Sequence, residues 1–333
     1  MDEIPSPELR NGKDVIIRIA GAGLCHTDIA CMDGVLADIR GKSPKLPFTL
    51  GHENAGYVRR VGRDVIGFKK GDAVLVYGAW GCGTCEFCRR GEKNRCPVNP
   101  ITLGLSPEFE GGFAEEMYIP SYESLLKVTG DPTDLAPLTD AGLTAYRATK
   151  KVQKYLTPGS FSLVIGAGGL GLYAIQYLKL LGPSQVIATD LVEGKLELAT
   201  KYGADTALKA DSDDFASEIE KFTNKRRVRA VLDFVGKKES TELALKVLSN
   251  DAIYVDVGLG GGSMEVPLIY LIHSESVITG AMWGTFNELK EVYELARSGK
   301  IKSLVNRTKL SDINNAIAQM RKGRLMGRAV LTP

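Results

Sequence analysis

The first 140 residues carry short apolar segments that are separated by glycines and polar residues. Short segments rich in valine, isoleucine and tyrosine and bounded by glycine are typical of β-strands. No long run in this region spaces its apolar residues at the three-to-four interval of a helix. The pattern predicts a β-rich part with strands at 15–21, 54–62, 72–78 and 111–120.

The pattern changes after about residue 140. The stretch SLVIGAG (162–168) predicts a buried strand, and apolar residues then recur at helical spacing from Leu170 to Leu181. The alternation of strands and helices that follows predicts a parallel sheet covered by helices on both faces. The further elements are strands at 185–190, 229–236 and 252–258, helices ending at Tyr202 and spanning 239–249, and two amphipathic helices after residue 283.

Length and composition agree with two ordinary globular domains. The chain has 333 residues, of which 44% are hydrophobic and 25% charged, and a single core does not grow much beyond such a length. The net charge of +2 gives no electrostatic reason to expect a nucleic acid or an anionic membrane as a partner. The amino-terminal residues lack an apolar signal-peptide core, and no apolar run could span a bilayer, so we expect a cytoplasmic location.

A glycine motif lies at the predicted strand–helix turn. The stretch GAGGLG (166–171) fits G-x-G-x-x-G, in which the backbone turns tightly and approaches a pyrophosphate at the helix N-terminus. Asp190 ends the next strand, and its carboxylate can bond the ribose hydroxyls and would repel a 2′-phosphate, so NAD is preferred over NADP. The rival interpretation, that the glycines serve only helix–strand packing, is disfavoured by this context of strand, helix and Asp190 but stays an alternative. The predicted cofactor-binding residues here are Gly166, Gly168, Gly169, Leu170, Gly171 and Asp190.

Four of the six cysteines lie within one short charged stretch, spaced C-x2-C-x2-C-x7-C. They are Cys82, Cys85, Cys88 and Cys96. Four thiolates can surround a zinc ion tetrahedrally, which closes the site to water and substrate and makes it structural. Disulfides are disfavoured in a reducing compartment. An iron–sulfur cluster stays an alternative, because four cysteines alone do not select the metal.

The order of the motifs GLCHTD, GHENAG, CGTCEFCRRGEKNRC, GGFAEE, GAGGLG and GRAVLTP resembles the zinc-dependent medium-chain alcohol dehydrogenases over nearly the whole chain. The resemblance implies an α/β architecture of two domains. A GroES-like, β-rich catalytic domain would span 1–140 and 284–333, with a zinc lobe at 80–97. A Rossmann domain with a doubly wound parallel sheet, which binds NAD, would span 141–283.

The resemblance also implies a second, catalytic zinc, so that each chain would hold two zinc ions. Cys25 and His52 match two of its ligands, and Asp140 stands where the family typically has a cysteine. Because oxygen is a harder ligand than sulfur, we expect a somewhat stronger Lewis acid. Glu53 matches a glutamate that can move onto the metal, and Asp28 matches the carboxylate that orients the ligating histidine.

Further roles follow from the same resemblance. Thr27 matches the hydroxyl that accepts the alcohol proton, but the histidine that passes this proton to solvent in many members is replaced by Ala30. The resemblance assigns pyrophosphate contacts to His26 and Arg328, a place near the adenosine ribose to Lys195, and the substrate pocket to Trp80 and Trp283.

The implied activity is the reversible oxidation of primary or secondary alcohols to aldehydes or ketones, with hydride transfer to NAD. Small alcohols, aldehydes and ketones would be the partners, and the enzyme would be a homodimer or homotetramer joined through the segment 276–283. A polyol or sugar dehydrogenase of the same superfamily is the first alternative. The second is a non-catalytic zinc- and NAD-binding protein, suggested by Ala30 and by a chain that begins at MDEIPSPE, without the hairpin that usually opens the family.

Overall fold

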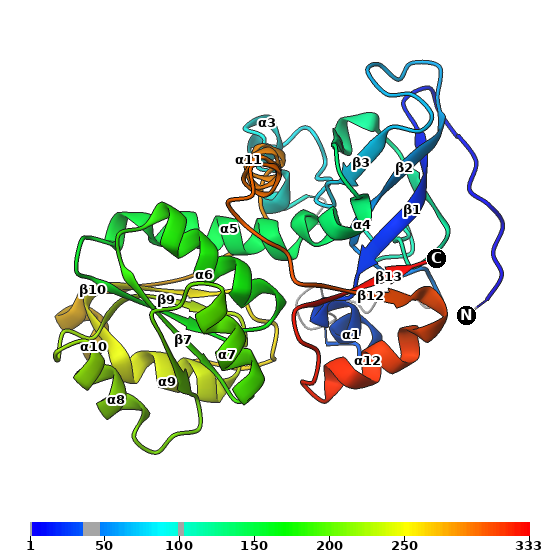
Figure 1. Cartoon of the computed structure of the whole chain (residues 1–333). Coiled ribbons are helices and arrows are strands. Elements are labelled where there is room, and N and C mark those ends of the chain that lie inside the picture. Colours follow the sequence, from blue (N-terminus) through cyan, green and yellow to red (C-terminus); the bar gives the residue numbers. More distant parts are fainter. Residues whose placement is uncertain (1, 36–46, 99–102) are drawn as a thin grey trace. The chain divides into compact units, whose positions relative to one another are not determined.

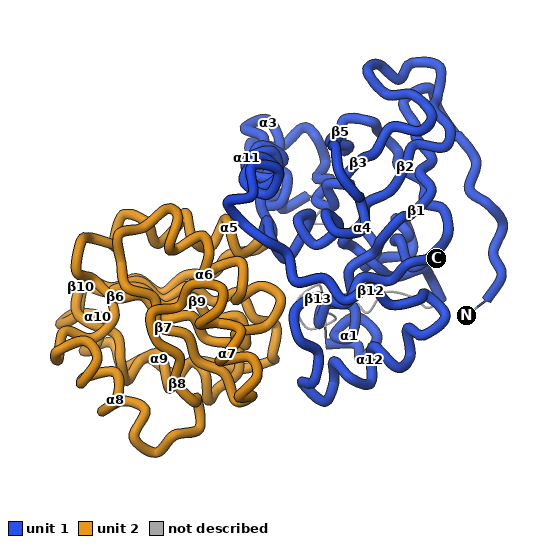
Figure 2. Tube along the Cα trace, viewed as in Figure 1, with its two compact units in different colours: residues 1–143, 283–333 blue, residues 144–282 orange. Residues whose placement is uncertain are grey.

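The computed structural model describes residues 2–35, 47–98 and 103–333 (Figure 1). The chain divides into two compact units (Figure 2). The first unit comprises Met1–Leu143 and Trp283–Pro333, and the second comprises Thr144–Met282. The expected domain limits, at 140 and 284, lie within a few residues of these limits.

The first unit is built on a sheet whose strands come from both ends of the chain. In the described residues it contains seven strands, in the order β12-β13-β1-β2-β3-β5, with β4 also paired to β1. All pairs are antiparallel except β12 with β13. The strands are β1 (Val15–Gly23), β2 (Glu53–Val61), β3 (Ala73–Val76), β4 (Glu116–Ile119), β5 (Leu125–Lys127), β12 (Val305–Lys309) and β13 (Arg328–Thr332).

Apolar side chains from these strands form the core of the first unit. Ile17, Val58, Val74 and Met117 are buried in one cluster, which explains why the predicted strand segments are rich in branched apolar residues. Helix α12 buries Ala316 against β13 in a second cluster. The α-helices described in this unit are α1 (His26–Met32), α3 (Glu86–Arg89), α4 (Pro132–Leu135), α11 (Phe286–Arg297) and α12 (Ile313–Arg321).

The second unit is a parallel sheet in the order β11-β10-β9-β6-β7-β8, with six strands in the described residues. All five residues of β6 are buried, as expected for a central strand with both faces covered. The strand order reverses at β6, which is the point where such sheets bind dinucleotides. The strands are β6 (Phe161–Ile165), β7 (Gln185–Asp190), β8 (Thr206–Lys209), β9 (Val228–Asp233), β10 (Leu248–Asp256) and β11 (Val277–Gly280).

The helices of the second unit connect these strands. They are α6 (Gly169–Leu181), α7 (Glu193–Lys201), α8 (Phe215–Phe222), α9 (Lys238–Val247) and α10 (Leu268–Ser274). Helix α5 (Ala141–Val152) crosses the limit between the units, and its pattern was not singled out in the sequence. Among the described helices, none combines the length and the apolar character needed to cross a membrane.

Candidate metal and nucleotide sites

Sheet register brings two of the predicted catalytic zinc ligands together. Gly23 at the end of β1 pairs with Glu53 at the start of β2. Cys25 and His52 lie just outside these two strand ends, so the antiparallel register places them side by side. Asp140 follows a short 3-10 helix (Ala136–Thr139) and precedes α5. The three residues are buried, and their donor atoms all lie within 4.8 Å of one another.

The distances among these donors fit a zinc ion. Asp140 Oδ2 lies 3.7 Å from Cys25 Sγ and 3.5 Å from His52 Nε2. Tetrahedral bonds of about 2.0–2.3 Å would separate such donors by roughly 3.3–3.5 Å. The arrangement can therefore hold the predicted catalytic zinc with little movement.

Asp28 contacts two of the three predicted zinc ligands. Its Oδ1 lies 3.0 Å from His52 Nδ1, and its Oδ2 accepts a hydrogen bond of 2.8 Å from the backbone N–H of Cys25. The first contact leaves Nε2 of His52 free to face a metal, which is the usual arrangement for a ligating histidine. This geometry matches the orienting role that the resemblance implies for Asp28.

The electrostatics of the site favour a bound cation. Burial opposes a charge on His52, yet the carboxylates of Asp28 and Asp140 hold the pKa of this imidazole well above its ordinary value. The carboxylates thus stabilise a positive charge at a buried position. A divalent ion between the same groups would neutralise their negative charge more fully than one proton does.

A buried ion pair lies against the ligands. Arg328 Nε donates to Glu53 Oε2 at 2.8 Å, and its Nη2 lies 3.4 Å from Asp140 Oδ2. Burial raises the pKa of Glu53 to about 7, although the guanidinium of Arg328 opposes the shift. Glu53 also accepts a hydrogen bond of 2.9 Å from the N–H of Ala141. The guanidinium of Arg328 contacts Glu53 and Asp140 in this structure. Its predicted contact with the pyrophosphate stays a prediction.

Helix α1 carries Thr27, predicted to accept the alcohol proton, and His26, whose predicted pyrophosphate contact stays a prediction. Thr27 is half-buried, and its hydroxyl lies 3.4 Å from Cys25 Sγ, beside the proposed metal. His26 is exposed on the first turn of the helix. Ala30 is buried with Cys31 and Leu105. Its methyl side chain cannot carry a proton, so it does not continue the proton path from Thr27 to solvent.

The two tryptophans occupy different surroundings. Trp80 is in the core of the first unit, packs edge-on against Phe109 and donates from Nε1 to the carbonyl of Tyr77. Trp283 packs edge-on against the ring of His52. The predicted substrate-pocket role of both residues stays a prediction.

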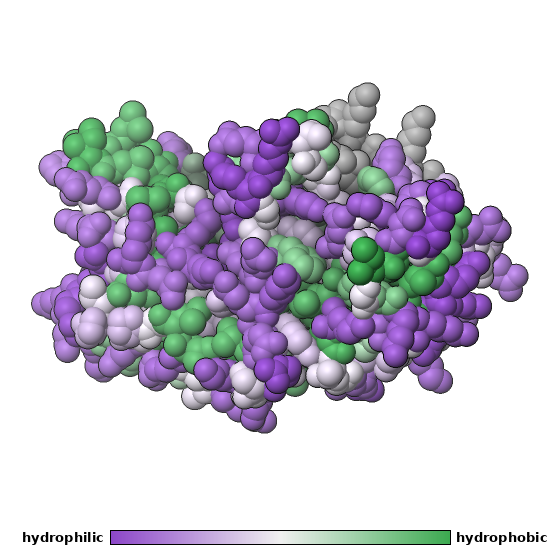
Figure 3. Space-filling view, turned by 90° about the horizontal axis from the view of Figure 1, so that it is seen from above, coloured by the Kyte–Doolittle hydropathy of each residue, from purple (hydrophilic) through white to green (hydrophobic). Residues whose placement is uncertain are grey.

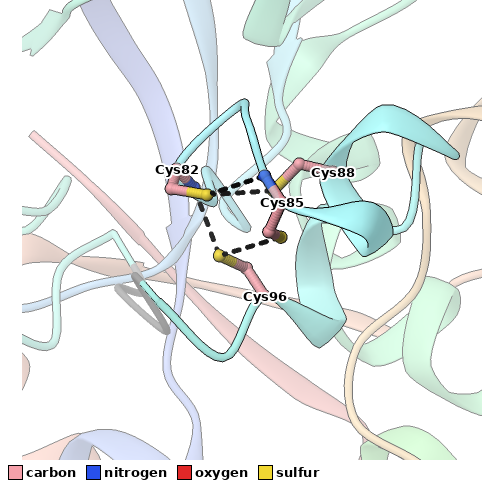
Figure 4. A group of neighbouring side chains, drawn as sticks. All are labelled: Cys82, Cys85, Cys88 and Cys96. Atoms are coloured by element: carbon pink, nitrogen blue, oxygen red, sulfur yellow. Dashed lines mark hydrogen bonds between the residues drawn. The ribbon is translucent and has the colours of Figure 1, made fainter.

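The four clustered cysteines converge in the loop around α3 (Figure 4). Cys82 Sγ lies 4.0 Å from Cys88 Sγ, and Cys85 Sγ lies 3.8 Å from Cys96 Sγ. Zinc–sulfur bonds of about 2.3 Å place tetrahedral sulfurs about 3.8 Å apart, so the cluster fits zinc. Burial raises the pKa of Cys88 to about 12, and a bound metal would stabilise its thiolate.

The glycine motif and Asp190 lie together in the second unit. Asp190 Oδ2 accepts a hydrogen bond of 2.9 Å from the N–H of Ala167, and Lys195 Nζ lies 3.9 Å from Asp190 Oδ1. Gly166 has φ +89°, and a Cβ at Gly171 would come within 2.0 Å of the Gly166 carbonyl oxygen. These two glycines are therefore required by the turn itself, as the motif predicts.

The open side of the turn can accept a ligand. A Cβ at Gly168 would meet nothing within 4 Å, so the backbone is exposed where a pyrophosphate would approach. Gly169 and Leu170 begin α6, whose N-terminal N–H groups favour an anion. The site thus has the features of a dinucleotide-binding turn.

Sequence reasoning missed Asp233, at the end of β9. Its Oδ1 accepts hydrogen bonds from the N–H groups of Val235 and Gly236, and its Oδ2 accepts one from the hydroxyl of Tyr254. In the sequence, Asp233 ends an apolar strand segment, as Asp190 does, and this was the only feature that could have marked it. Asp233 shapes the loop beside the point where the strand order reverses.

A β-rich unit with a buried Cys–His–Asp triad and a four-cysteine lobe, followed by a parallel sheet with a dinucleotide-binding turn, defines a zinc-dependent dehydrogenase. Residues 11–130 match the family described as alcohol dehydrogenase GroES-like domain, and residues 169–298 match the family described as zinc-binding dehydrogenase. The chain belongs to the zinc-dependent alcohol dehydrogenases of the medium-chain dehydrogenase/reductase superfamily. The predicted family and fold class are confirmed.

Relatives match the chain over its full length. An NAD-dependent alcohol dehydrogenase of Sulfurisphaera tokodaii is 37% identical over 341 residues, which cover 100% of this chain and 96% of the relative. A D-arabinose 1-dehydrogenase (NADP(+)) of Saccharolobus solfataricus is 35% identical over 334 residues, or 99% and 92% of the two chains. The crystal structure of the alcohol dehydrogenase of Aeropyrum pernix superposes with a TM-score of 0.94 at 40% identity. The match covers 100% of this chain and 96% of the other.

Proposed function

We propose that this protein oxidises primary or secondary alcohols to aldehydes or ketones, reversibly, and transfers the hydride to NAD. The observation that carries the proposal is the buried convergence of Cys25, His52 and Asp140 on one point, at distances that fit zinc. A site with three protein ligands keeps a position for substrate, unlike the closed four-cysteine site.

Each residue near the triad has a role in this reaction. Cys25, His52 and Asp140 would hold the zinc, which when bound polarises the alcohol or carbonyl oxygen as a Lewis acid. As hydride leaves the neighbouring carbon for the nicotinamide, the hydroxyl of Thr27 would accept the alcohol proton and pass its own proton on to water, because Ala30 offers no acceptor. Asp28 holds His52 in the ligating orientation, and Arg328 supplies positive charge that balances Glu53.

The proposed preference for NAD over NADP rests on Asp190. Its carboxylate is held at the glycine turn by Ala167, where it would accept hydrogen bonds from the ribose hydroxyls and repel a 2′-phosphate. Measuring kcat/KM with NAD and with NADP on one alcohol tests this choice. Equal values, or a preference for NADP as in the name of the D-arabinose relative, would contradict it.

The second candidate is a sugar or polyol dehydrogenase, which the full-length match to the D-arabinose enzyme favours. Zinc analysis combined with NADH formation on ethanol, 2-butanol, benzyl alcohol, sorbitol and D-arabinose separates the two. Two zinc ions per chain with turnover of the simple alcohols supports the proposal. Preference for sorbitol or D-arabinose moves the enzyme to the second candidate, and bound zinc and NAD without turnover indicates a non-catalytic protein.

We further propose that the enzyme is a homo-oligomer joined through β11. This strand is at the edge of the second sheet, and Figure 3 shows apolar side chains gathered on the surface of the second unit. Exposed apolar side chains on and beside α10 and β11 are Leu268, Ile269, Ile272, Val277, Ile278 and Met282. Such a patch is costly in a monomer and typical of an interface.

The oligomer and its location can both be tested. Light scattering should give a dimer or tetramer for the wild type, and Ile272→Glu should lower the mass to that of a smaller species. A monomeric wild type would contradict the proposal. We also propose a cytoplasmic location, because metal-binding thiols are kept reduced there. Cell fractionation tests it.

A further inference from the structure

The indole of Trp283 contacts both sides of the proposed catalytic metal site. Its Nε1 donates a hydrogen bond of 2.7 Å to the carbonyl of Thr139, the residue directly before Asp140. Its ring also meets the ring of His52 edge-on, with centroids 5.8 Å apart and planes at 69°. One side chain thus contacts one ligand and holds the backbone beside another, although these ligands lie far apart in the sequence.

The backbone around Trp283 is held in an unusual conformation. Its φ is +50°, a value that residues with a bulky side chain rarely adopt. The adjacent Gly284 carbonyl accepts a hydrogen bond of 2.8 Å from the Tyr77 hydroxyl, which anchors the segment to the first unit. A Cβ at Gly78 would lie 2.5 Å from the Trp283 ring. Because glycine has no side chain, the indole can fill this space. Strain that surrounding contacts maintain in this way is typical of functional sites.

Asp140 needs such support because it lies between two helical segments. Its own backbone has φ −134° and ψ −67°, outside the conformation of the helix that precedes it and of α5 that follows. The direction of its carboxylate therefore depends on what holds the Thr139–Asp140 peptide. The Trp283 indole is the side chain whose hydrogen bond reaches that carbonyl.

We propose that Trp283 is a positioning residue for the catalytic metal: it fixes the Thr139 carbonyl, and through it Asp140, while its ring supports His52. This inference rests on the proposed zinc chemistry of the triad. The role differs from the predicted one of lining the substrate pocket, because it concerns the affinity and geometry of the metal before any substrate binds.

Trp80 provides a matched control. It is also buried in the first unit, and its Nε1 donates a hydrogen bond of 2.6 Å to the Tyr77 carbonyl. Its ring packs against Phe109 instead of a ligand. Trp80→Phe and Trp283→Phe therefore each remove one indole N–H bond to a backbone carbonyl, but only the second removes a bond beside Asp140 in the Cys–His–Asp triad. Trp80 lies next to the four-cysteine lobe, so the comparison is made at the triad zinc alone.

The test measures metal binding in the purified full-length protein. Zinc content, the rate of zinc release to a chromogenic chelator, and the visible spectrum of the cobalt-substituted protein are compared for the wild type and both variants. Loss of an outer contact to a metal ligand typically lowers metal affinity about 10–100-fold. We expect this loss at one of the two zinc sites in Trp283→Phe, with an altered cobalt spectrum, while Trp80→Phe binds metal within about twofold of the wild type.

Several outcomes decide the matter. Unchanged zinc release and an unchanged cobalt spectrum in Trp283→Phe would overturn the positioning role, as would an equal loss in Trp80→Phe. A wild type that holds no zinc at the triad would instead overturn the proposed function, so the two failures are distinguishable.

A second route covers the case in which Trp283→Phe does not fold. In Trp80→Phe, Trp283 is the only tryptophan left of the two in the chain. Selective removal of the catalytic zinc should then change the fluorescence of Trp283, because the indole contacts a freed ligand. Fluorescence that does not respond would count against the proposal. Gly78→Ala, whose Cβ would lie 2.5 Å from the indole ring, should weaken zinc binding in the same direction.

Discussion

The guanidinium of Arg328 donates to both carboxylate oxygens of Glu53, with Nε 2.8 Å from Oε2 and Nη2 in contact with Oε1. Both side chains are buried, at 6% and 0% exposure. Arg328 begins β13 and Glu53 begins β2, and both strands pair with β1 between them. The carboxy-terminal strand thus places a buried positive charge beside the metal ligands, which ties the last residues of the chain to the chemistry of the site.

The first prediction concerns this ion pair. Arg328→Met leaves Glu53 buried without its partner, so at pH 8, where Glu53 of the wild type is ionised, we expect the free energy of unfolding to fall by about 3–5 kcal/mol. The double variant Arg328→Met with Glu53→Leu removes both charges and should recover most of that loss. Urea unfolding of the zinc-loaded protein measures both. A loss below about 1 kcal/mol in the single variant would contradict the account.

The second prediction concerns the unusual third ligand. Asp140→Asn removes a negative charge from the triad, and we expect the catalytic zinc to be lost while the four-cysteine site keeps its ion. Asp140→Cys supplies the ligand that is typical of the family and should retain two zinc ions per chain. Zinc analysis after dialysis checks both, with Asp134→Asn on α4 as the control. Full zinc retention in Asp140→Asn would show that another group is the third ligand.

Local patterns allowed much of the fold to be predicted, because burial imposes its period directly on the sequence. Strand β6 and helix α6 are examples: an apolar run is followed by a glycine turn and then by helical spacing. Helix α5 was missed because it buries polar residues, Thr144 and Thr149, among its apolar ones, so no clear apolar stripe marks it in the sequence.

The candidate site was predicted by residue but not by contact. Cys25, His52 and Asp140 could be selected from the motifs around them. The Arg328–Glu53 pair and the Trp283–His52 contact depend instead on strand register and on the return of the chain to the first unit. Pairing between distant segments leaves no periodic signal in a single sequence. These contacts therefore could not be predicted from the sequence.

The third prediction concerns the cofactor. Asp190→Asn keeps an oxygen that can accept from the Ala167 N–H but removes the charge. A hydrogen bond to a charged group contributes about 1.5–3 kcal/mol, so KM for NAD should rise roughly 10–100-fold, while kcat/KM for NADP should improve relative to NAD. Steady-state kinetics with both cofactors measure the change, and Asp211→Asn serves as control. An unchanged ratio would show that Asp190 does not read the ribose.

The fourth prediction concerns pH. Burial, together with the nearby Asp233 carboxylate, raises the pKa of Asp256 from 3.8 to about 6. Between these values the folded state keeps a proton that the unfolded chain releases, so this group makes stability fall as pH rises from about 4 to about 6. Asp256→Asn removes that contribution.

The variant should therefore gain stability relative to the wild type across this window and keep the gain above it. Thermal unfolding from pH 4.5 to 7.5 follows the difference, with the exposed Asp213→Asn as control. A difference between variant and wild type that does not change with pH would refute the assignment.

The last prediction concerns the four-cysteine lobe. Cys88→Ala removes one of four sulfurs, and we expect the loss of one zinc ion per chain, faster proteolysis at 80–97 and a lower Tm. About 1 kcal/mol moves the Tm of a chain of this size by roughly 2–4 °C, so the loss of a metal that closes the lobe should lower Tm by about 5–15 °C. Cys31→Ala is the control, because Cys31 is also buried but lies in a small apolar cluster away from the lobe. If Cys88→Ala keeps two zinc ions, or if the wild-type protein carries a coloured iron–sulfur cluster, then the lobe does not hold zinc through these four sulfurs.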